Sequence, residues 1–294
     1  MHLLLTAAVL MLMVSIGMSL RMSELVERWR SVSAWSWAWL VLATFLFPPL
    51  LALALVQLLS LGLGATAGLF MVAATPGAPL LTRKIAKRGF DVHLAASYQV
   101  WGALLTPLIL PPVVLAAGKL YGRDIWIPPS ALLMQIAEKQ FLPLLVGLAL
   151  ASLVPKASAR LLPVLNVVGN LILTGVLLVL LVKMGPALLK LDPWLLVAAL
   201  GLAGGCMLFV ALLPGADERV RGTLGISNTN RHVGLALLLS GQYLHRKDAL
   251  PAIAAYSLAA VLVIAVYTQV SRRWAHPEAA APSSGAVPPT STAG

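Results

Sequence analysis

The chain has 294 residues, of which 60% are hydrophobic and only 11% are charged, and its mean hydropathy is +0.91. Soluble domains do not reach these values, so the composition excludes a soluble enzyme or binding domain and predicts an all-α polytopic membrane protein. The net charge of +11 is explained by basic loops that meet anionic lipid headgroups, and we expect no nucleic-acid partner.

Nine apolar stretches are each long enough to cross about 30 Å of hydrocarbon. They cover residues 2–20, 34–59, 61–95, 97–120, 130–154, 159–185, 193–213, 218–241 and 250–270. The first stretch lacks the basic segment and cleavage site of a signal peptide, so we interpret it as a helix. We expect residues 1–274 to form one transmembrane domain and residues 275–294, rich in Pro, Ala, Ser and Gly, to be a disordered cytosolic tail.

The orientation in the membrane follows from the distribution of Lys and Arg. With these nine crossings, the loops on one side hold thirteen basic residues and the loops on the other side hold six. Basic loops stay in the cytosol, so we predict an integral plasma or inner membrane protein with its N-terminus outside and its C-terminus in the cytosol.

The third stretch is too long for one crossing and too short for two crossings with a loop. Within its sequence TPGAP, Pro76 and Pro79 remove backbone donors, and Gly77 permits dihedral angles that other residues avoid. We predict a broken helix whose free backbone groups, from Thr75 to Pro79, line a binding site. The alternative is a plain turn between two re-entrant halves.

The eighth stretch contains the polar run Ser227 to His232. Its first four side chains compete for backbone hydrogen bonds and predict unwinding over Ser227 to Asn230. Arg231 lies about 18 Å from the cytosolic end of the stretch, too deep to reach the interface easily. A buried cation in a membrane marks a pathway or a counter-ion site. The alternative is a structural ion pair, with Glu138 as the first candidate partner.

The two breaks lie in the third and eighth crossings, five crossings apart. Because five is odd, a repeated five-helix unit would place its second copy upside down. We therefore predict an inverted repeat of four plus five helices, with discontinuous helices near the midplane that bind substrate and ions.

Five short segments, in this order, resemble the bile acid:sodium symporter family. They are GMSL at 17–20, TPGAP at 75–79, RGFDVHLAASYQVWGALLTPLILP at 88–111, FLPLLVGL at 141–148 and NRHVGLAL at 230–237. The resemblance spans nearly the whole chain. It implies nine or ten helices in a panel domain and a core domain, two broken helices that cross, and secondary transport of organic anions.

The chain departs from the family where sodium-coupled relatives bind their ion. Those relatives carry Ser-Asn after the first break, Ser and Thr on the next helix, and Glu followed by Gln in the second break. The matching positions here are Leu81 and Thr82, Ala95 and Gln99, and Ser227 and Arg231. Most family ligands for Na⁺ are thus missing, and we hypothesise that the guanidinium of Arg231 replaces the ion.

The planar fork of an arginine suits a carboxylate or a sulfate, so we predict a small organic anion as the substrate. The predicted substrate-binding residues are Thr75, Gly77, Thr82, Gln99, Asn228, Asn230, Arg231 and His232. The predicted ion-coupling residues are Ser227, Thr229 and Glu138. His232 is a candidate either for a structural role or for carrying a coupled proton.

The chain shows no Ser-His-Asp set, no phosphate-binding Walker loop and no metal-ligand spacing. Its single cysteine, Cys206, lies in an apolar stretch. We therefore expect no enzyme activity, no cofactor and no resident metal. The alternative functions are a membrane receptor or accessory subunit that keeps the fold without transport, and a uniport or proton-coupled carrier of a small metabolite.

Overall fold

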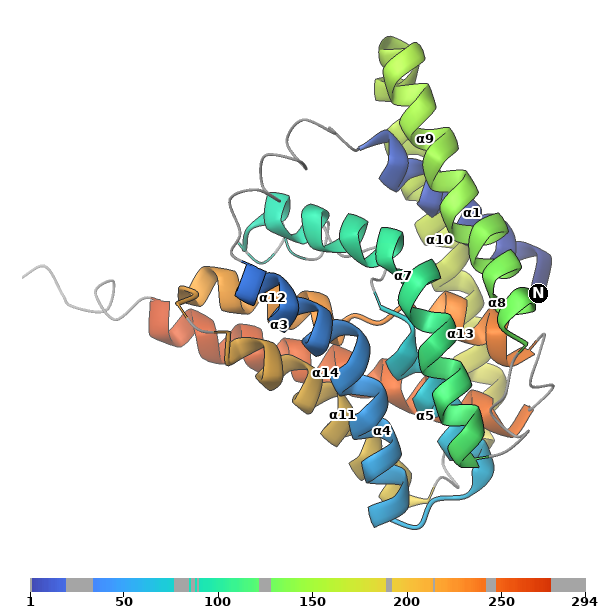
Figure 1. Ribbon diagram of the computed structural model, residues 1–294, viewed down its shortest axis with the longest axis vertical. Coiled ribbons are helices and arrows are strands. Elements are labelled where there is room, and N and C mark those ends of the chain that lie inside the picture. Colours follow the sequence, from blue (N-terminus) through green and yellow to red (C-terminus); the bar gives the residue numbers. More distant parts are fainter. Residues whose placement is uncertain are drawn as a thin grey trace, which may run out of the picture.

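The computed structural model describes residues 2–19, 34–76, 85, 88, 90–121, 128–188, 192–213, 215–241 and 247–275. These residues form helices and no strands, which confirms the all-α class (Figure 1). The α-helices are α1 (His2–Met18), α3 (Ala34–Val41), α4 (Phe47–Leu58), α5 (Leu63–Ala74), α7 (Val92–Tyr121), α8 (Pro129–Ile136), α9 (Leu142–Leu153), α10 (Pro155–Leu188), α11 (Pro193–Ala211), α12 (Glu218–Thr229), α13 (Val233–Leu239) and α14 (Leu250–Ala275). The π-helical segments η1 (Leu42–Leu46) and η3 (Ala137–Phe141) and the 3₁₀ segment η5 (Lys247–Ala249) complete the set.

Six of the described helices are long and apolar enough to cross a membrane, and α1 and α5 are shorter apolar helices. Together they make this an integral, polytopic membrane protein. Every predicted crossing contains a described helix, although the number of crossings stays a prediction. One boundary was wrong, because Ala95 belongs to α7 and not to the third crossing.

The start of α7 and of two other helices is set by aspartate side chains. Asp91, Asp192 and Asp217 each accept a backbone N–H two or three residues further along the chain, at 2.7 to 2.9 Å. Such caps satisfy backbone donors that the first helical turn leaves free. Asp91 thus explains why α7 begins several residues before the predicted start.

The helices pack in two groups. One group joins α1 to α9 and α10, and the other joins α4, α5, α11, α12 and α14 (Figure 1). In the first group, the hydroxyl of Ser15 donates to the side-chain oxygen of Asn166 at 2.8 Å and links α1 to α10. This division agrees with the panel and core domains that the family resemblance implies.

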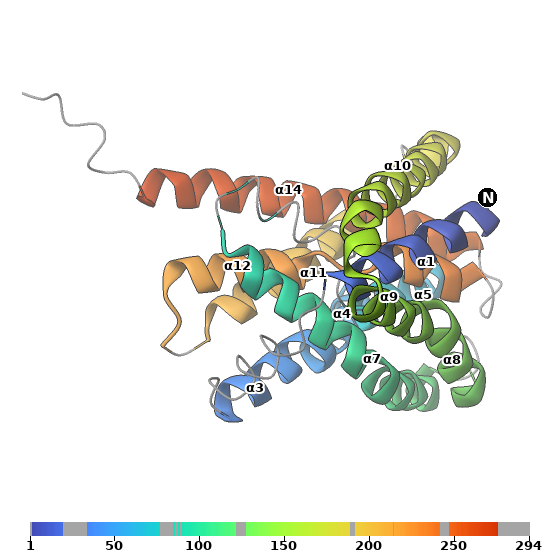
Figure 2. The same ribbon diagram turned by 90° about the horizontal axis from the view of Figure 1, so that it is seen from above.

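Helix α7 connects the two groups, because it packs on α12 and also on α8. It bends in its middle, as both ribbon views show (Figures 1 and 2). Pro107, Pro111 and Pro112 lie inside the helix, and each removes a backbone hydrogen bond. The prolines therefore account for the bend.

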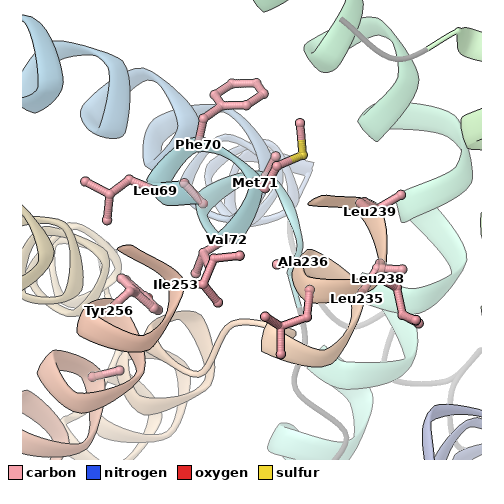
Figure 3. Packing of buried hydrophobic residues seen from close by; sticks show 14 of the residues in the cluster. Leu69, Phe70, Met71, Val72, Leu235, Ala236, Leu238, Leu239, Ile253 and Tyr256 are labelled. Atoms are coloured by element: carbon pink, nitrogen blue, oxygen red, sulfur yellow. The ribbon is translucent and has the colours of Figure 1, made fainter. Parts of the chain in front are cut away.

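Both predicted breaks coincide with helix ends. Helix α5 stops at Ala74, and α12 stops at Thr229 before α13 begins at Val233. Apolar side chains of α5 and α13 pack against one another and against α14 (Figure 3). Buried apolar contacts therefore hold α5, which ends at the first break, and α13, which follows the second.

Candidate functional site

The two breaks meet in the protein interior. The backbone N–H of His232 donates to the backbone oxygen of Thr75 at 3.0 Å, and both residues are buried. Thr75 has an extended backbone, and its hydroxyl donates to the carbonyl of Met71 at 3.0 Å, within its own helix. A backbone oxygen at the first break thus accepts a hydrogen bond from a backbone N–H at the second break.

The second break is shorter than predicted and lies further along the chain. We expected unwinding over Ser227 to Asn230, but α12 continues through Thr229. The reason is that the hydroxyls of Ser227 and Thr229 donate to carbonyls one turn earlier in the helix, those of Thr223 and Gly225. Such bonds are compatible with a helix, so only the segment from Asn230 to His232 is open.

Arg231 projects from this open segment into the interior, with 3% of its surface exposed. Its Nη1 donates to the backbone oxygen of Thr44 at 2.8 Å, and its Nη2 lies 4.0 Å from the Cys206 sulfur. Among the described residues, no carboxylate pairs with this guanidinium. Within the described part of the chain, the positive charge of Arg231 is therefore not compensated by a carboxylate.

The alternative interpretation, a structural ion pair between Arg231 and Glu138, is not what the described residues form. Glu138 lies in η3, and its carboxylate is 3.6 Å from the ammonium of Lys139, with 54% of the Glu138 side chain exposed. The chain places Glu138 on the outer side of its helix, while Arg231 is held by a backbone carbonyl. Glu138 as an ion-coupling residue stays a prediction.

The π-helical segment η1 supplies the carbonyls of this site. The side-chain nitrogen of Asn228 donates to the backbone oxygens of Ala43, at 3.1 Å, and of Cys206, at 2.8 Å. Arg231 donates to the carbonyl of Thr44, the residue that follows Ala43. A π-turn has poorer internal hydrogen bonds than an α-helix, so its carbonyls can accept bonds from other elements.

Two tyrosines that were not among the predicted site residues complete the cluster. The hydroxyl of Tyr98 donates to the side-chain oxygen of Asn228 at 3.0 Å and lies 2.9 Å from the hydroxyl of Thr44. The hydroxyl of Tyr256 donates to the carbonyl of Thr229 at 2.8 Å, at the end of α12. The available signal was a tyrosine hydroxyl within an apolar stretch.

Three predicted substrate-binding residues have buried nitrogen atoms that find no hydrogen-bond partner among the described residues. They are Nε2 of Gln99, Nε of Arg231 and Nε2 of His232, in side chains that are at most 3% exposed. Nδ1 of His232 accepts from the N–H of Leu235 at 3.0 Å, so the proton of the neutral ring is on Nε2. Buried donors are rarely left without a partner, and such atoms point to a ligand or an ordered water.

The fifth crossing carries two further buried amides. Gln135 has both side-chain polar atoms without a partner, and Gln140 has its oxygen without one. They are five residues apart, which would separate them around an α-helix, but the extra residue of the π-helical η3 brings them toward one face. Both are buried, and the intervening Glu138 is exposed.

Three predicted substrate-binding residues remain, and the structure describes only one of them. Asn230 is buried at the end of α12. Gly77 and Thr82 lie outside the described residues. Among the described residues, Thr75 joins the first break to the second through its backbone oxygen.

The chain was compared with known proteins. Residues 6–191, well over half of the chain, match the model of the Sodium Bile acid symporter family. Among curated proteins, no relative matched. The family match includes Thr75 and Gln99 and ends before the second break. The chain therefore belongs to the sodium bile acid symporter family and is a membrane transporter.

Proposed function

We propose that this transporter moves a small organic anion by secondary-active alternating access, and that Arg231 takes the place of a coupled cation. The observation that carries the proposal is the buried guanidinium of Arg231 at the meeting point of the two breaks, to which the described residues bring no carboxylate. Nε of Arg231 and Nε2 of the adjacent His232 also have no hydrogen-bond partner among the described residues.

Charge supports an anion as the substrate. A guanidinium inside a membrane protein is costly unless it is paired, and the described residues bring no carboxylate to Arg231. The carboxylate or sulfate of a substrate would supply the missing negative charge. Such a group accepts several hydrogen bonds at once, which suits the several N–H donors of a guanidinium.

The same geometry argues against sodium near the second break. Sodium binds oxygen atoms, and the Thr44 carbonyl is already occupied by Arg231 at 2.8 Å. A sodium ion about 4 Å from the guanidinium would be repelled by about 4 kcal/mol at an effective dielectric of about 20. The fixed cation therefore performs the electrostatic role of the ion without being transported.

Alternating access is supported by the two helix groups. The group of α1, α9 and α10 contains no break, and both breaks lie in the other group. In addition, α5 of the third crossing packs on α14 of the ninth, and α12 of the eighth crossing packs in the same way on α7 of the fourth. Helix α4 of the second crossing packs on α11 of the seventh. These are the pairs that an inverted repeat of four plus five helices requires. A rocking motion between the two groups would expose the site to one side at a time.

The experiment that tests the substrate class is ligand-dependent thermal unfolding of the purified protein. A panel of carboxylates and sulfated organic anions is added in sodium chloride and again in choline chloride, with the wild type and with Arg231→Ala. We expect a stabilising anion whose effect is equal in both salts and absent in Arg231→Ala. Arg221→Ala is the matched control, because Arg221 lies exposed on α12, the helix that precedes the open segment of Arg231. Stabilisation only in sodium would overturn the proposal that Arg231 replaces the ion.

Flux separates a transporter of this anion from a receptor that binds it. The anion that stabilises the protein is offered to proteoliposomes, and its uptake is measured with and without a sodium gradient. We expect uptake that does not depend on sodium. Stabilisation without uptake would identify a binding protein that kept the fold.

A further inference from the structure

A cavity of about 100 Å³ lies beside the polar cluster, between the helix formed by α3 and η1, the first half of α7, and α12. Its walls are mostly apolar and include Trp37, Phe45, Trp101 and Leu224. The rings of Trp37 and Trp101 meet edge to face, with centroids 5.5 Å apart. The cavity is of the scale of one ring or a short branched chain, since a cavity of about 150 Å³ takes up benzene in an engineered protein.

Three residues with hydroxyl groups line the cavity, Thr44, Tyr98 and Ser97, and the first two form a hydrogen-bonded pair. The hydroxyl oxygens of Thr44 and Tyr98 are 2.9 Å apart. Asn228 donates through its nitrogen to two backbone carbonyls, so its oxygen must accept, and Tyr98 donates to it. The single proton of the Tyr98 hydroxyl is then used, and Thr44 must donate to Tyr98.

The direction of this hydrogen-bond chain decides what the cavity can bind. Both hydroxyl protons point along the chain from Thr44 through Tyr98 to Asn228, so these two groups offer only lone pairs to a ligand. A molecule that binds to this pair must therefore donate a hydrogen bond. The guanidinium of Arg231, bound to the Thr44 carbonyl, disfavours a cationic donor such as an ammonium group.

We propose that this cavity is a binding site for a small, uncharged, apolar molecule with a hydroxyl group, which donates to the lone pairs of Thr44 and Tyr98. The aromatic and aliphatic walls bury the apolar body of the ligand. The cavity is a site of its own, because Gln99, Arg231 and His232 are not among its lining residues. The inference does not rest on the proposed transport of an anion.

Gly102 offers a way to fill the cavity without disturbing the fold. It lines the cavity, and no atom lies within 4 Å of the position that a Cβ would take. Gly102→Leu therefore places a side chain in the ligand space. Gly204→Leu is the matched control, because a Cβ at Gly204 also meets nothing within 4 Å and Gly204 is not part of the cavity.

The test uses the full chain in lipid nanodiscs and the quenching of tryptophan fluorescence by bromine. The probes are 2-bromocyclohexanol and its methyl ether, which has the same body without the hydroxyl donor. We expect saturable quenching by the alcohol in the wild type and in Gly204→Leu, and its loss in Gly102→Leu. The ether should bind about two- to tenfold more weakly, the usual effect of one hydrogen bond.

Two results would overturn the inference. Equal saturable quenching in Gly102→Leu and the wild type would show that the alcohol binds elsewhere, and equal affinity for alcohol and ether would remove the role of the hydroxyl. Leu105→Phe, a second substitution that narrows the cavity, guards against misfolding of Gly102→Leu. A stabilising organic anion should leave the alcohol's affinity unchanged, and competition between them would contradict a separate site.

Discussion

Arg231 is held by backbone oxygen rather than by a carboxylate, and this shapes the chemistry of the site. One end of its guanidinium is bound to the Thr44 carbonyl, while Nε has no partner. A positive charge in this setting raises the free energy of the protein unless a ligand neutralises it. The residue is thus suited both to fill the position of a cation and to attract an anion.

Replacing Arg231 by glutamine tests the first role. Arg231→Gln keeps an amide donor but removes the charge, leaving oxygen atoms and space that a cation can occupy. We expect anion uptake by proteoliposomes to fall about tenfold or more without added cation, as for the loss of a charge-assisted hydrogen bond, and to recover partly with sodium or lithium. Arg221→Gln should transport as the wild type does. An unchanged rate in Arg231→Gln would refute the hypothesis.

Asn228 joins four elements through one side chain. It accepts from Tyr98 on α7 and donates to Ala43 on η1 and Cys206 on α11. Asn228→Ala leaves these buried partners unsatisfied, so we expect a loss of roughly 1–3 kcal/mol of stability. Thermal unfolding measures the loss, and Ser257→Ala is the control, because Ser257 bonds only within its own helix. A melting temperature equal to that of the wild type would show that the bonds contribute little.

The residue-level predictions succeeded where chemistry is local to the chain. A polar run inside an apolar stretch predicted a buried, interrupted helix, and Asn230 to His232 form that interruption. The partners were not predictable, because Thr44 and Cys206 lie far from Arg231 in sequence and one of them contributes only its backbone. Every residue type has a backbone carbonyl, so the sequence does not show which carbonyl accepts a hydrogen bond from a side chain.

At the scale of elements, α1 and α9 cross at a reciprocal pair of glycines. A Cβ at Gly17 would strike the backbone oxygen of Leu144, and a Cβ at Gly147 would strike that of Val14. Only glycine permits backbones to approach this closely, as in other membrane helix pairs with small residues. The contact fixes the geometry of the helix group that lacks breaks.

The close crossing of α1 and α9 predicts that one added methyl group destabilises the protein. Gly17→Ala and Gly147→Ala should each destabilise the protein by about 1–3 kcal/mol, the usual cost of overpacking. Gly175→Ala in α10 should be neutral or stabilising, since no atom lies within 4 Å of its Cβ position. Thermal unfolding of the three variants in one detergent compares them, and equal melting temperatures would contradict the tight crossing.

The π-helical segments were not predicted. Hydropathy and spacing describe the second and fifth crossings as plain helices, yet η1 and η3 interrupt them. A π-turn is tolerated when tertiary contacts use the carbonyls or the side-chain placement that it creates. The π-helical segments therefore depend on contacts with neighbouring helices, and a local pattern of residues does not predict those contacts.

At the scale of the whole molecule, the predicted orientation is open to a direct test. Ser60, between α4 and α5, and Lys156, at the start of α10, are both exposed and are predicted to lie on opposite sides of the membrane. We expect a membrane-impermeant maleimide to label Ser60→Cys in intact cells, and Lys156→Cys only after permeabilisation. The wild type, whose Cys206 is fully buried, should remain unlabelled. The reverse pattern would invert the topology.

By itself, the sequence determined the class of the protein, the positions of its apolar helices and the presence of two interruptions. These follow from hydrophobic length, proline and glycine placement and polar runs, which act along the chain. Only the tertiary structure decided that His232 bonds to Thr75, that Arg231 is held by Thr44, and that a cavity opens beside Tyr98. Each of these depends on the packing of helices that are distant in sequence. The packing involves backbone atoms and empty space, which the residue types do not specify.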